Sequence, residues 1–249
     1  MSGFFADFRA VHAKSLAFAA ALPLIAAIPL VAEFIQHVVE MQIGMYSGPE
    51  GAEAAATNAD RMNFGFAKII ALSLPAYCVI RWLHSNGDKS FATRLERPAI
   101  GLFGLVLALQ ALFAWLSLYI WTEGYMAAGF FVFGLIFMPL IVRFVVAAPL
   151  GTLVTPLQSI RTMLPHAFYA ILFPLVAILP LMAVHYALGI GAVFVAGEGV
   201  KWAMLVVDSF ATAWLALAMI AAQYVIATRP APIAAHGTGS LAGRDRPGT

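Results

Sequence analysis

The sequence predicts an all-α, polytopic membrane protein with six transmembrane helices and an amphipathic inner-leaflet helix between the fourth and the fifth. Hydrophobic residues make up 62% of the 249 positions and charged residues 10%, whereas a soluble domain carries about 25% charged residues. The mean hydropathy is +0.90. A water-soluble fold of this size could not cover so much apolar surface, so the bilayer is expected to be the solvent of this chain.

Six stretches of the chain are long and apolar enough to cross a bilayer, which takes roughly 20 residues. The first follows Arg9 and Lys14, as the apolar part of a signal peptide follows basic residues. It is longer than the roughly 7–15 apolar residues of a signal peptide, so we interpret it as a helix of the mature protein. The predicted spans are Ser15 to Gln36, Gly65 to Leu83, Pro98 to Ile120, Tyr125 to Ala148, His166 to Gly191 and Trp202 to Thr228.

The basic residues predict the orientation, because the cytoplasmic loops of membrane proteins are enriched in Lys and Arg. With the N-terminus in the cytoplasm, eleven of the fourteen basic residues lie on the inner side, and only Arg61, Lys68 and Lys201 lie on the outer side. Both ends are therefore expected in the cytoplasm. Abundant alanine, and ten arginines against four lysines, are typical of a high-GC bacterial gene. We therefore expect a multi-pass protein of the bacterial inner (plasma) membrane.

The chain is expected to form a single transmembrane domain over residues 1–228. The acidic, alanine-rich stretch Glu50 to Asp60 predicts a short surface helix in the first outer loop, and the tight link Thr122 to Gly124 predicts an antiparallel helix hairpin. Residues 229–249 are rich in Pro, Gly and Ala, a composition that favours a disordered cytoplasmic tail.

The inner segment Leu150 to Pro165 has the pattern of a helix lying on a membrane surface. Apolar residues recur in it at helical spacing and alternate with polar ones, Thr155, Gln158, Ser159 and Arg161. This pattern predicts an amphipathic helix on the inner leaflet. The apolar residues are Leu153, Leu157, Ile160 and Leu164.

Two segments share an unusual pattern of prolines. Leu22 to Ala32 and Phe173 to Ala183 each contain two prolines six residues apart, at 23 and 29 and at 174 and 180. An internal duplication and convergence of two apolar helices both explain the match. In either case the prolines predict kinks, because each removes a backbone donor.

Four titratable residues on four predicted helices share the outer third of the membrane: Glu33, Lys68, His185 and Asp208. Ionisable groups within spans are costly and mark functional sites. The functional interpretation is a polar site that binds a cation, a proton or a head group. The structural interpretation is an ion pair, together with side chains whose charged ends extend to the membrane interface. Lys68 is the preferred partner of Asp208, with Glu33 as the competitor for Lys68 and His185 as the alternative partner of Asp208.

Three arginines are expected near the inner leaflet: Arg81, Arg143 and Arg161. Together they form a candidate site for an anionic lipid head group. The alternative is ordinary snorkelling of basic side chains at helix ends.

The sequence predicts no catalytic residue, metal site or cofactor. Its one cysteine, Cys78, cannot form a cysteine-rich metal site, and no zinc-protease, P-loop, nucleophile-elbow or dinucleotide motif occurs. His37 and His185 are the only pair to consider for haem, but His37 is predicted at the interface. A net charge of +2 gives no reason to expect a nucleic acid partner.

The stretch Gly134 to Met163 resembles a known family. It combines Arg143, Ala148-Pro149 and Ser159-Ile160-Arg161 before a long apolar helix. It resembles the membrane domains fused to some glycerophosphodiester phosphodiesterases and the YciC-like inner-membrane proteins. The resemblance implies six helices with an amphipathic helix before the fifth. Phe133-Gly134 replaces the usual Pro-Gly, and the 249 residues include no phosphodiesterase domain.

Two functional classes remain open. The first is a non-enzymatic envelope protein, a lipid-associated scaffold whose partners are membrane lipids and another membrane protein. The second is a small transporter or permease that uses the outer polar cluster. A transporter requires the polar residues to converge on a cavity, whereas a scaffold requires only that they be paired.

Overall fold

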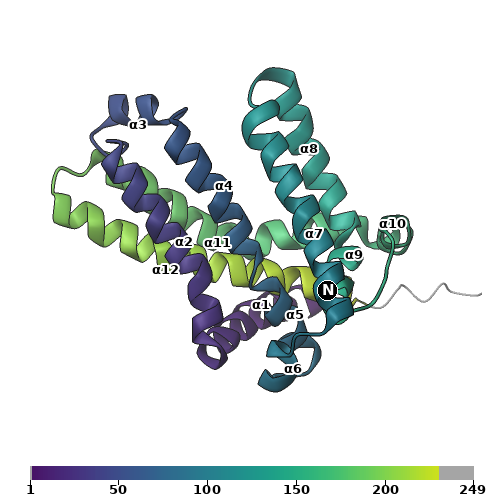
Figure 1. The fold of residues 1–249 in the computed structure, drawn as a ribbon. Helices are drawn as coiled ribbons and strands as arrows, with labels where there is room; N and C mark the ends of the chain where they lie inside the picture. The colour runs from purple at the N-terminus through teal and green to yellow at the C-terminus, as the bar shows by residue number, and fades with distance from the viewer. Residues whose placement is uncertain (1, 230–249) are drawn as a thin grey trace, which may run out of the picture.

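The computed structural model describes residues 2–229, and these residues form helices with no strand among them (Figure 1). Five helical stretches of this part are long and apolar enough to cross a membrane, or six when the bent pair α8 and α9 is counted as one span. The predicted all-α polytopic fold is therefore confirmed. The α-helices are α1 (Ser2–Ala21), α2 (Pro23–Gln42), α3 (Pro49–Ala55), α4 (Ala59–Ser73), α5 (Ala76–His84), α6 (Lys89–Thr93), α7 (Arg97–Trp115), α8 (Gly124–Leu140), α9 (Val142–Ala147), α10 (Pro156–Met163), α11 (Ala167–Phe194) and α12 (Glu198–Ala227).

The first predicted span was placed wrongly. The chain breaks at Leu22, whose φ of −132° and ψ of 63° are not helical, because a residue before proline is disfavoured in the α region. Pro23 then starts α2 at a position where a proline costs nothing, since the first helical N–H has no partner in any case. The span therefore begins at Pro23 and extends to Gln42, so that His37 and Glu40 lie in the helix and not in a loop.

The remaining predicted spans agree with the structure to within a few residues at most of their ends. The second begins earlier, at Ala59, and is divided at Pro75 into α4 and α5. The third ends in a short π-helical turn, Leu116–Ile120. The predicted surface helix is α3, and the predicted hairpin is formed by α7 and α8, whose Phe113 and Phe130 stack with ring centroids 4.0 Å apart.

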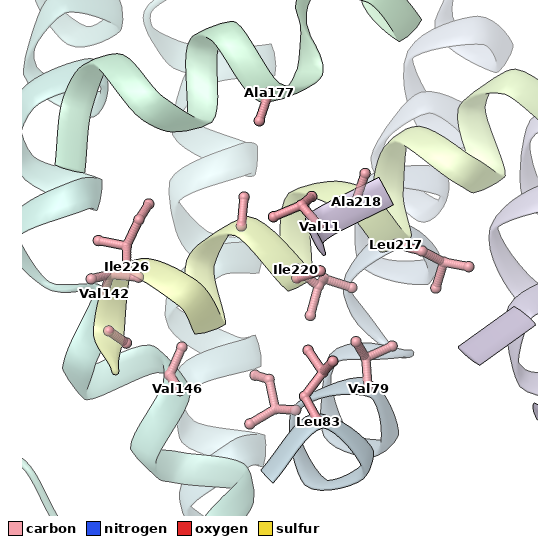
Figure 2. Packing of buried hydrophobic residues seen from close by; sticks show 14 of the residues in the cluster. Val11, Val79, Leu83, Val142, Val146, Ala177, Leu217, Ala218, Ile220 and Ile226 are labelled. Atoms are coloured by element: carbon pink, nitrogen blue, oxygen red, sulfur yellow. The ribbon is translucent and has the colours of Figure 1, made fainter. Parts of the chain in front are cut away.

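The helix α12 occupies the centre of the bundle and packs against α1, α2, α5, α9 and α11. Its buried face is rich in alanine, which allows close helix approach in a membrane. Figure 2 shows Leu217, Ala218, Ile220 and Ile226 of this helix surrounded by apolar side chains of its neighbours, Val11, Val79, Leu83, Val142, Val146 and Ala177.

A bend of 56° separates α8 from α9, and a side chain of α10 occupies it. The hydroxyl of Ser159 donates to the carbonyl of Leu140 at 2.9 Å and accepts from the N–H of Arg143 at 3.1 Å. Both backbone groups would otherwise be unpaired where the helix is interrupted, so Ser159 replaces the missing helical partners. The side chain is fully buried.

The amphipathic segment forms α10, which starts with a capping box between Thr155 and Gln158. Leu153, Leu157 and Leu164 are exposed on the outside of the bundle, while Ser159 and Met163 face inward. The predicted apolar face is therefore available to lipid, and the polar Ser159 attaches the helix to the α8–α9 bend.

Replacing Ser159 by alanine is expected to destabilise the fold by about 1–3 kcal/mol, because two buried backbone groups lose their partner. Thermal unfolding in detergent should show a lower midpoint for Ser159→Ala. The exposed Ser90 supplies the matched control, and Ser90→Ala should leave the midpoint unchanged. Equal midpoints for both variants would contradict the proposed role of Ser159.

The two similar segments differ in structure at their first prolines. Pro23 starts α2 after a break, whereas Pro174 lies inside the continuous helix α11. The second pair, Pro29 and Pro180, lies inside helices in both cases.

The end of the predicted domain needs one correction. Arg229, predicted to belong to the tail, packs against the transmembrane domain. Its Nη1 is 3.2 Å from Asp7 Oδ2, and its carbonyl accepts from Arg143 Nη2 at 2.9 Å. The remainder of the predicted tail, residues 230–249, lies outside the described residues.

Candidate functional site

One face of α2 supplies three residues of a buried polar cluster. Glu33, His37 and Glu40 are spaced four and three residues apart, which places them one above another on a single helix face. That face packs against α4 and α12. All three side chains are at most 7% exposed, although charged groups are seldom buried without a partner.

All four residues of the predicted polar cluster line one cavity of about 470 Å³ at the end of the bundle where α3 lies. Asp208 of α12 is fully buried, and Glu33 is 1% exposed. Further polar residues, which the prediction did not include, also line this cavity. The polar lining consists of Glu33, His37, Glu40, Tyr46, Arg61, Lys68, His185, Tyr186 and Asp208.

The preferred pairing of Asp208 with Lys68 is not formed among the described residues. The ammonium of Lys68 lies 3.2 Å from Glu33 Oε1 and 3.1 Å from Oε2. Asp208 instead lies beside two imidazoles, with its oxygens 3.0 Å from His37 Nε2 and 2.8 Å from His185 Nδ1. The competitor named for Lys68 and the alternative partner named for Asp208 are therefore the observed partners, and His37 is an additional one.

The hydrogen bonds around His37 determine which of its nitrogens carries a proton. The Tyr46 hydroxyl donates to Glu40 Oε2 at 2.6 Å, because a carboxylate can only accept. The Nδ1 of His37 contacts that same Glu40 oxygen at 3.2 Å and the Tyr46 oxygen at 3.1 Å, so Nδ1 must be the donor. The other nitrogen, Nε2, then points at two carboxylates, 3.0 Å from Asp208 and 3.5 Å from Glu33.

The charges of the cluster do not balance unless one more cation is present. Lys68 neutralises Glu33, and Arg61 neutralises Glu40 at 3.2 Å. Asp208 has only imidazole partners. A fully buried carboxylate without a positive partner is strongly unfavourable. One positive charge is therefore needed at Asp208, and a protonated imidazole, a bound cation or a proton on the carboxyl itself supplies it.

The linker between α2 and α3 covers the cluster. Tyr46 is 3% exposed, and its carbonyl accepts from the ammonium of Lys201 at the start of α12. Burial, followed by the negative charge of Glu40, raises the pKa of Tyr46 above its ordinary value. The phenol is therefore neutral and remains a hydrogen-bond donor at all working pH values.

Four residues of the site were missed. His37 and Glu40 were missed because the first span was predicted to end at Gln36, Arg61 because the second was predicted to begin at Gly65, and Tyr46 because it lies in the loop between them. The sequence did contain a signal for two of them. Glu33, His37 and Glu40 fall on one helical face, and continuing the helix past Gln36 would have placed all three together.

The three predicted lipid-binding arginines have different surroundings. Arg81 is fully buried: its Nε donates to the carbonyl of Phe91 at 2.9 Å and its Nη1 to that of Pro149 at 3.0 Å. Its guanidinium therefore contacts protein oxygens and is not at the surface. Arg143 is half-buried and donates to the carbonyl of Arg229, while Arg161 is exposed on α10.

No family model, curated protein or solved structure matches this chain. The site must therefore be interpreted from its own geometry.

Proposed function

We propose that this chain is a multi-pass membrane protein that binds a small cation in the cavity beside Asp208 and acts as a small transporter or permease. One observation carries the proposal: three helices, α2, α4 and α12, direct three carboxylates and only two permanent cations into one cavity. A transporter, unlike a scaffold, requires its polar residues to converge on a cavity, and the polar residues of this chain do so.

The local chemistry favours a cation over an anion or a neutral solute. Asp208 lies in a buried environment where an attraction between charges is much stronger than in water. An ion that reaches Asp208 exchanges part of its hydration shell for carboxylate and imidazole groups, which hydrogen bonds already hold in place. Intramembrane acidic and histidine residues of this kind form ion and proton pathways in other membrane proteins.

The location proposed for this site is the outer side of a bacterial inner membrane, with both termini in the cytoplasm. The support is the distribution of basic residues, eleven of fourteen on the inner side. In Figure 1, α3 and α6 lie at opposite ends of the drawing, in agreement with an outer position for α3 and an inner position for α6.

The orientation predicts which cysteines an impermeant thiol reagent can reach from outside. On a Cys78→Ser background in intact cells, Ala54→Cys on α3 should react and Ser90→Cys on α6 should not. Both positions are exposed, and permeabilised cells should label both. Labelling of Ser90→Cys alone in intact cells would reverse the proposed topology.

Transport is tested with purified protein in liposomes, using a panel of H⁺, Na⁺, K⁺, Mg²⁺, Ca²⁺ and Zn²⁺ gradients. At least one cation should cross faster than in protein-free vesicles, and Asp208→Asn should reduce that rate by about tenfold or more, because it removes the uncompensated charge. Asp60→Asn, an exposed change in α4, should have no effect. If no cation of the panel crosses faster than in empty vesicles, the transporter proposal is wrong.

The second candidate is a lipid-associated envelope scaffold that contacts lipids and another membrane protein. The observation in its favour is the packing of α12 beyond Thr212, where small side chains such as Ala216, Ala218 and Ala222 are buried against neighbouring helices. A scaffold gains stability from such packing without having to open. It predicts unchanged cation permeability in the same liposomes.

A further inference from the structure

We propose that the cation is a divalent transition metal ion such as Zn²⁺, held by Glu33, His37 and Asp208. This inference rests on the proposed cation-binding role of the cavity and names the class of its substrate. One ligand atom from each of these buried residues lies within 4.8 Å of the other two.

The spacing of the ligand atoms fits a tetrahedral metal ion. Zinc bonds to imidazole nitrogen and carboxylate oxygen are about 2.0–2.2 Å long, so two ligands of a tetrahedral ion lie about 3.3–3.5 Å apart. The His37 Nε2 is 3.5 Å from Glu33 Oε1 and 3.0 Å from Asp208 Oδ2. A metal ion can therefore be accommodated by small side-chain movements.

The surrounding hydrogen bonds orient the ligands as they do in metal sites. Glu40 accepts from His37 Nδ1, which directs the metal-binding nitrogen of His37 into the cluster. His185 donates to the second oxygen of Asp208. Carboxylate–histidine–metal arrangements of this kind fix the ring orientation and raise the basicity of the ligand.

A buried oxygen that lacks a hydrogen bond gives independent support. Glu33 Oε2 is inaccessible to solvent and has no hydrogen-bond partner among the described residues, although the ammonium of Lys68 is 3.1 Å away. Such an atom is unusual in a folded interior. A metal bond to Oε2 itself, alone or together with Oε1 in a bidentate carboxylate, would satisfy this atom.

The ligand types distinguish between classes of cation. Mg²⁺ and Ca²⁺ prefer oxygen ligands only, whereas imidazole suits Zn²⁺ and its neighbours among the transition metals. Three protein ligands leave a fourth position for water on the cavity side, as in zinc sites that exchange a ligand. An open position is what a site requires if its ion is to enter and leave.

Lys68 acts in this arrangement as the internal competitor of the metal. Its ammonium contacts both oxygens of Glu33, one of the proposed ligands. Binding a divalent ion beside this ammonium costs electrostatic repulsion, and part of its attraction for Glu33 must be given up. Removing the ammonium should therefore strengthen metal binding, whereas it should weaken a purely structural ion-pair cluster.

The test uses tag-free, full-length protein stripped of metal and titrated with ZnCl₂ by isothermal calorimetry in detergent. One Zn²⁺ per chain is expected, with no comparable binding of Mg²⁺ or Ca²⁺. His37→Gln and Asp208→Asn should each weaken binding about 100-fold or more, and Glu40→Gln about 10–100-fold with the stoichiometry kept. His84→Gln, an exposed change near α6, should have no effect.

Two further measurements do not depend on the folding of ligand variants. Co²⁺ added to the unmodified protein should give the intense visible spectrum of a four-coordinate ion. Lys68→Met should bind Zn²⁺ about tenfold more tightly than the unmodified protein. Undiminished Zn²⁺ binding in His37→Gln, or no binding to the folded unmodified protein, would overturn the metal assignment.

The outcomes separate this inference from the proposed function. Movement of another cation through liposomes, without Zn²⁺ binding, would refute the metal site and leave the transporter intact. Tight Zn²⁺ binding without movement of any cation would support the site and refute transport.

Discussion

Replacing Arg81 by methionine is expected to lower the free energy of unfolding by about 3–5 kcal/mol, the range for removing one partner of a buried charged network. The change leaves two carbonyls, those of Phe91 and Pro149, without their donor. It also removes a guanidinium placed 4.1 Å above the Phe91 ring, a contact worth up to about 2 kcal/mol when desolvated. These groups join α5, α6 and the segment after α9, so their loss should loosen that end of the bundle.

The measurement is thermal unfolding in detergent, where Arg81→Met should lower the midpoint by roughly 10 °C. Arg97→Met removes the same charge from an exposed position and should shift the midpoint little. Arg81→Lys should recover only part of the loss, because lysine lacks the planar fork of donors. A midpoint unchanged by Arg81→Met would show that this contact network does not stabilise the fold.

Acid titration gives a second readout of Arg81. Hydrogen bonds from Arg81 first, and then from Arg94, lower the pKa of Glu96 below its ordinary value of 4.5. A carboxyl whose folded pKa is lowered contributes stability above its unfolded pKa, and this contribution is lost as the pH falls through the folded value. Stability should therefore decline below about pH 4.5, and Arg81→Met should weaken this decline.

Replacing Lys68 by methionine is the second change with a large expected effect. It leaves the carboxylate of Glu33, 1% exposed, without its ammonium partner. Leaving one charge of a buried pair uncompensated costs about 3–5 kcal/mol. Thermal unfolding of metal-free Lys68→Met should show this loss, whereas Lys89→Met, at an exposed position, should not.

The double variant Glu33→Gln with Lys68→Met should recover part of that stability, because no charge is then left unpaired. Added Zn²⁺ should also stabilise Lys68→Met, but not the double variant, because only the single variant retains the Glu33 ligand. Strictly additive losses in the double-mutant cycle would show that Glu33 and Lys68 do not interact.

The sequence was sufficient to predict the fold class and four members of the polar cluster. Long apolar stretches determine where helices cross a membrane, and residue rise along a helix gives the depth of each charge. For that reason the amino-acid order alone places Glu33, Lys68, His185 and Asp208 in the same outer third of the membrane. Depth carries no information on helix rotation or on which helices are neighbours, so the sequence could not decide between Asp208 and Glu33 as the partner of Lys68.

The early end of the first predicted span and the omission of His37 and Glu40 from the polar cluster have a common physical origin. Hydropathy assigns a charged segment to water, and therefore ended the first span before His37 and Glu40. In the folded chain these groups are accommodated by partners from elsewhere, Asp208 of α12 and Arg61 of α4. Tertiary pairing thus overrides the local cost. Arg81 is a similar case, because its position at a helix end does not reveal whether it contacts lipid or protein.

The central position of α12 has a consequence for biogenesis. A ribosome delivers helices in chain order, so α2 reaches the translocon with Glu33, His37 and Glu40 long before Asp208 exists. Each such group is costly at membrane depth. Lys68 and Arg61 of α4 arrive next and can neutralise two of the carboxylates, but the alanine-rich face around which the bundle packs comes last. Assembly intermediates therefore lack the central helix, and the time for which they must avoid degradation or misfolding is the time taken to synthesise α12.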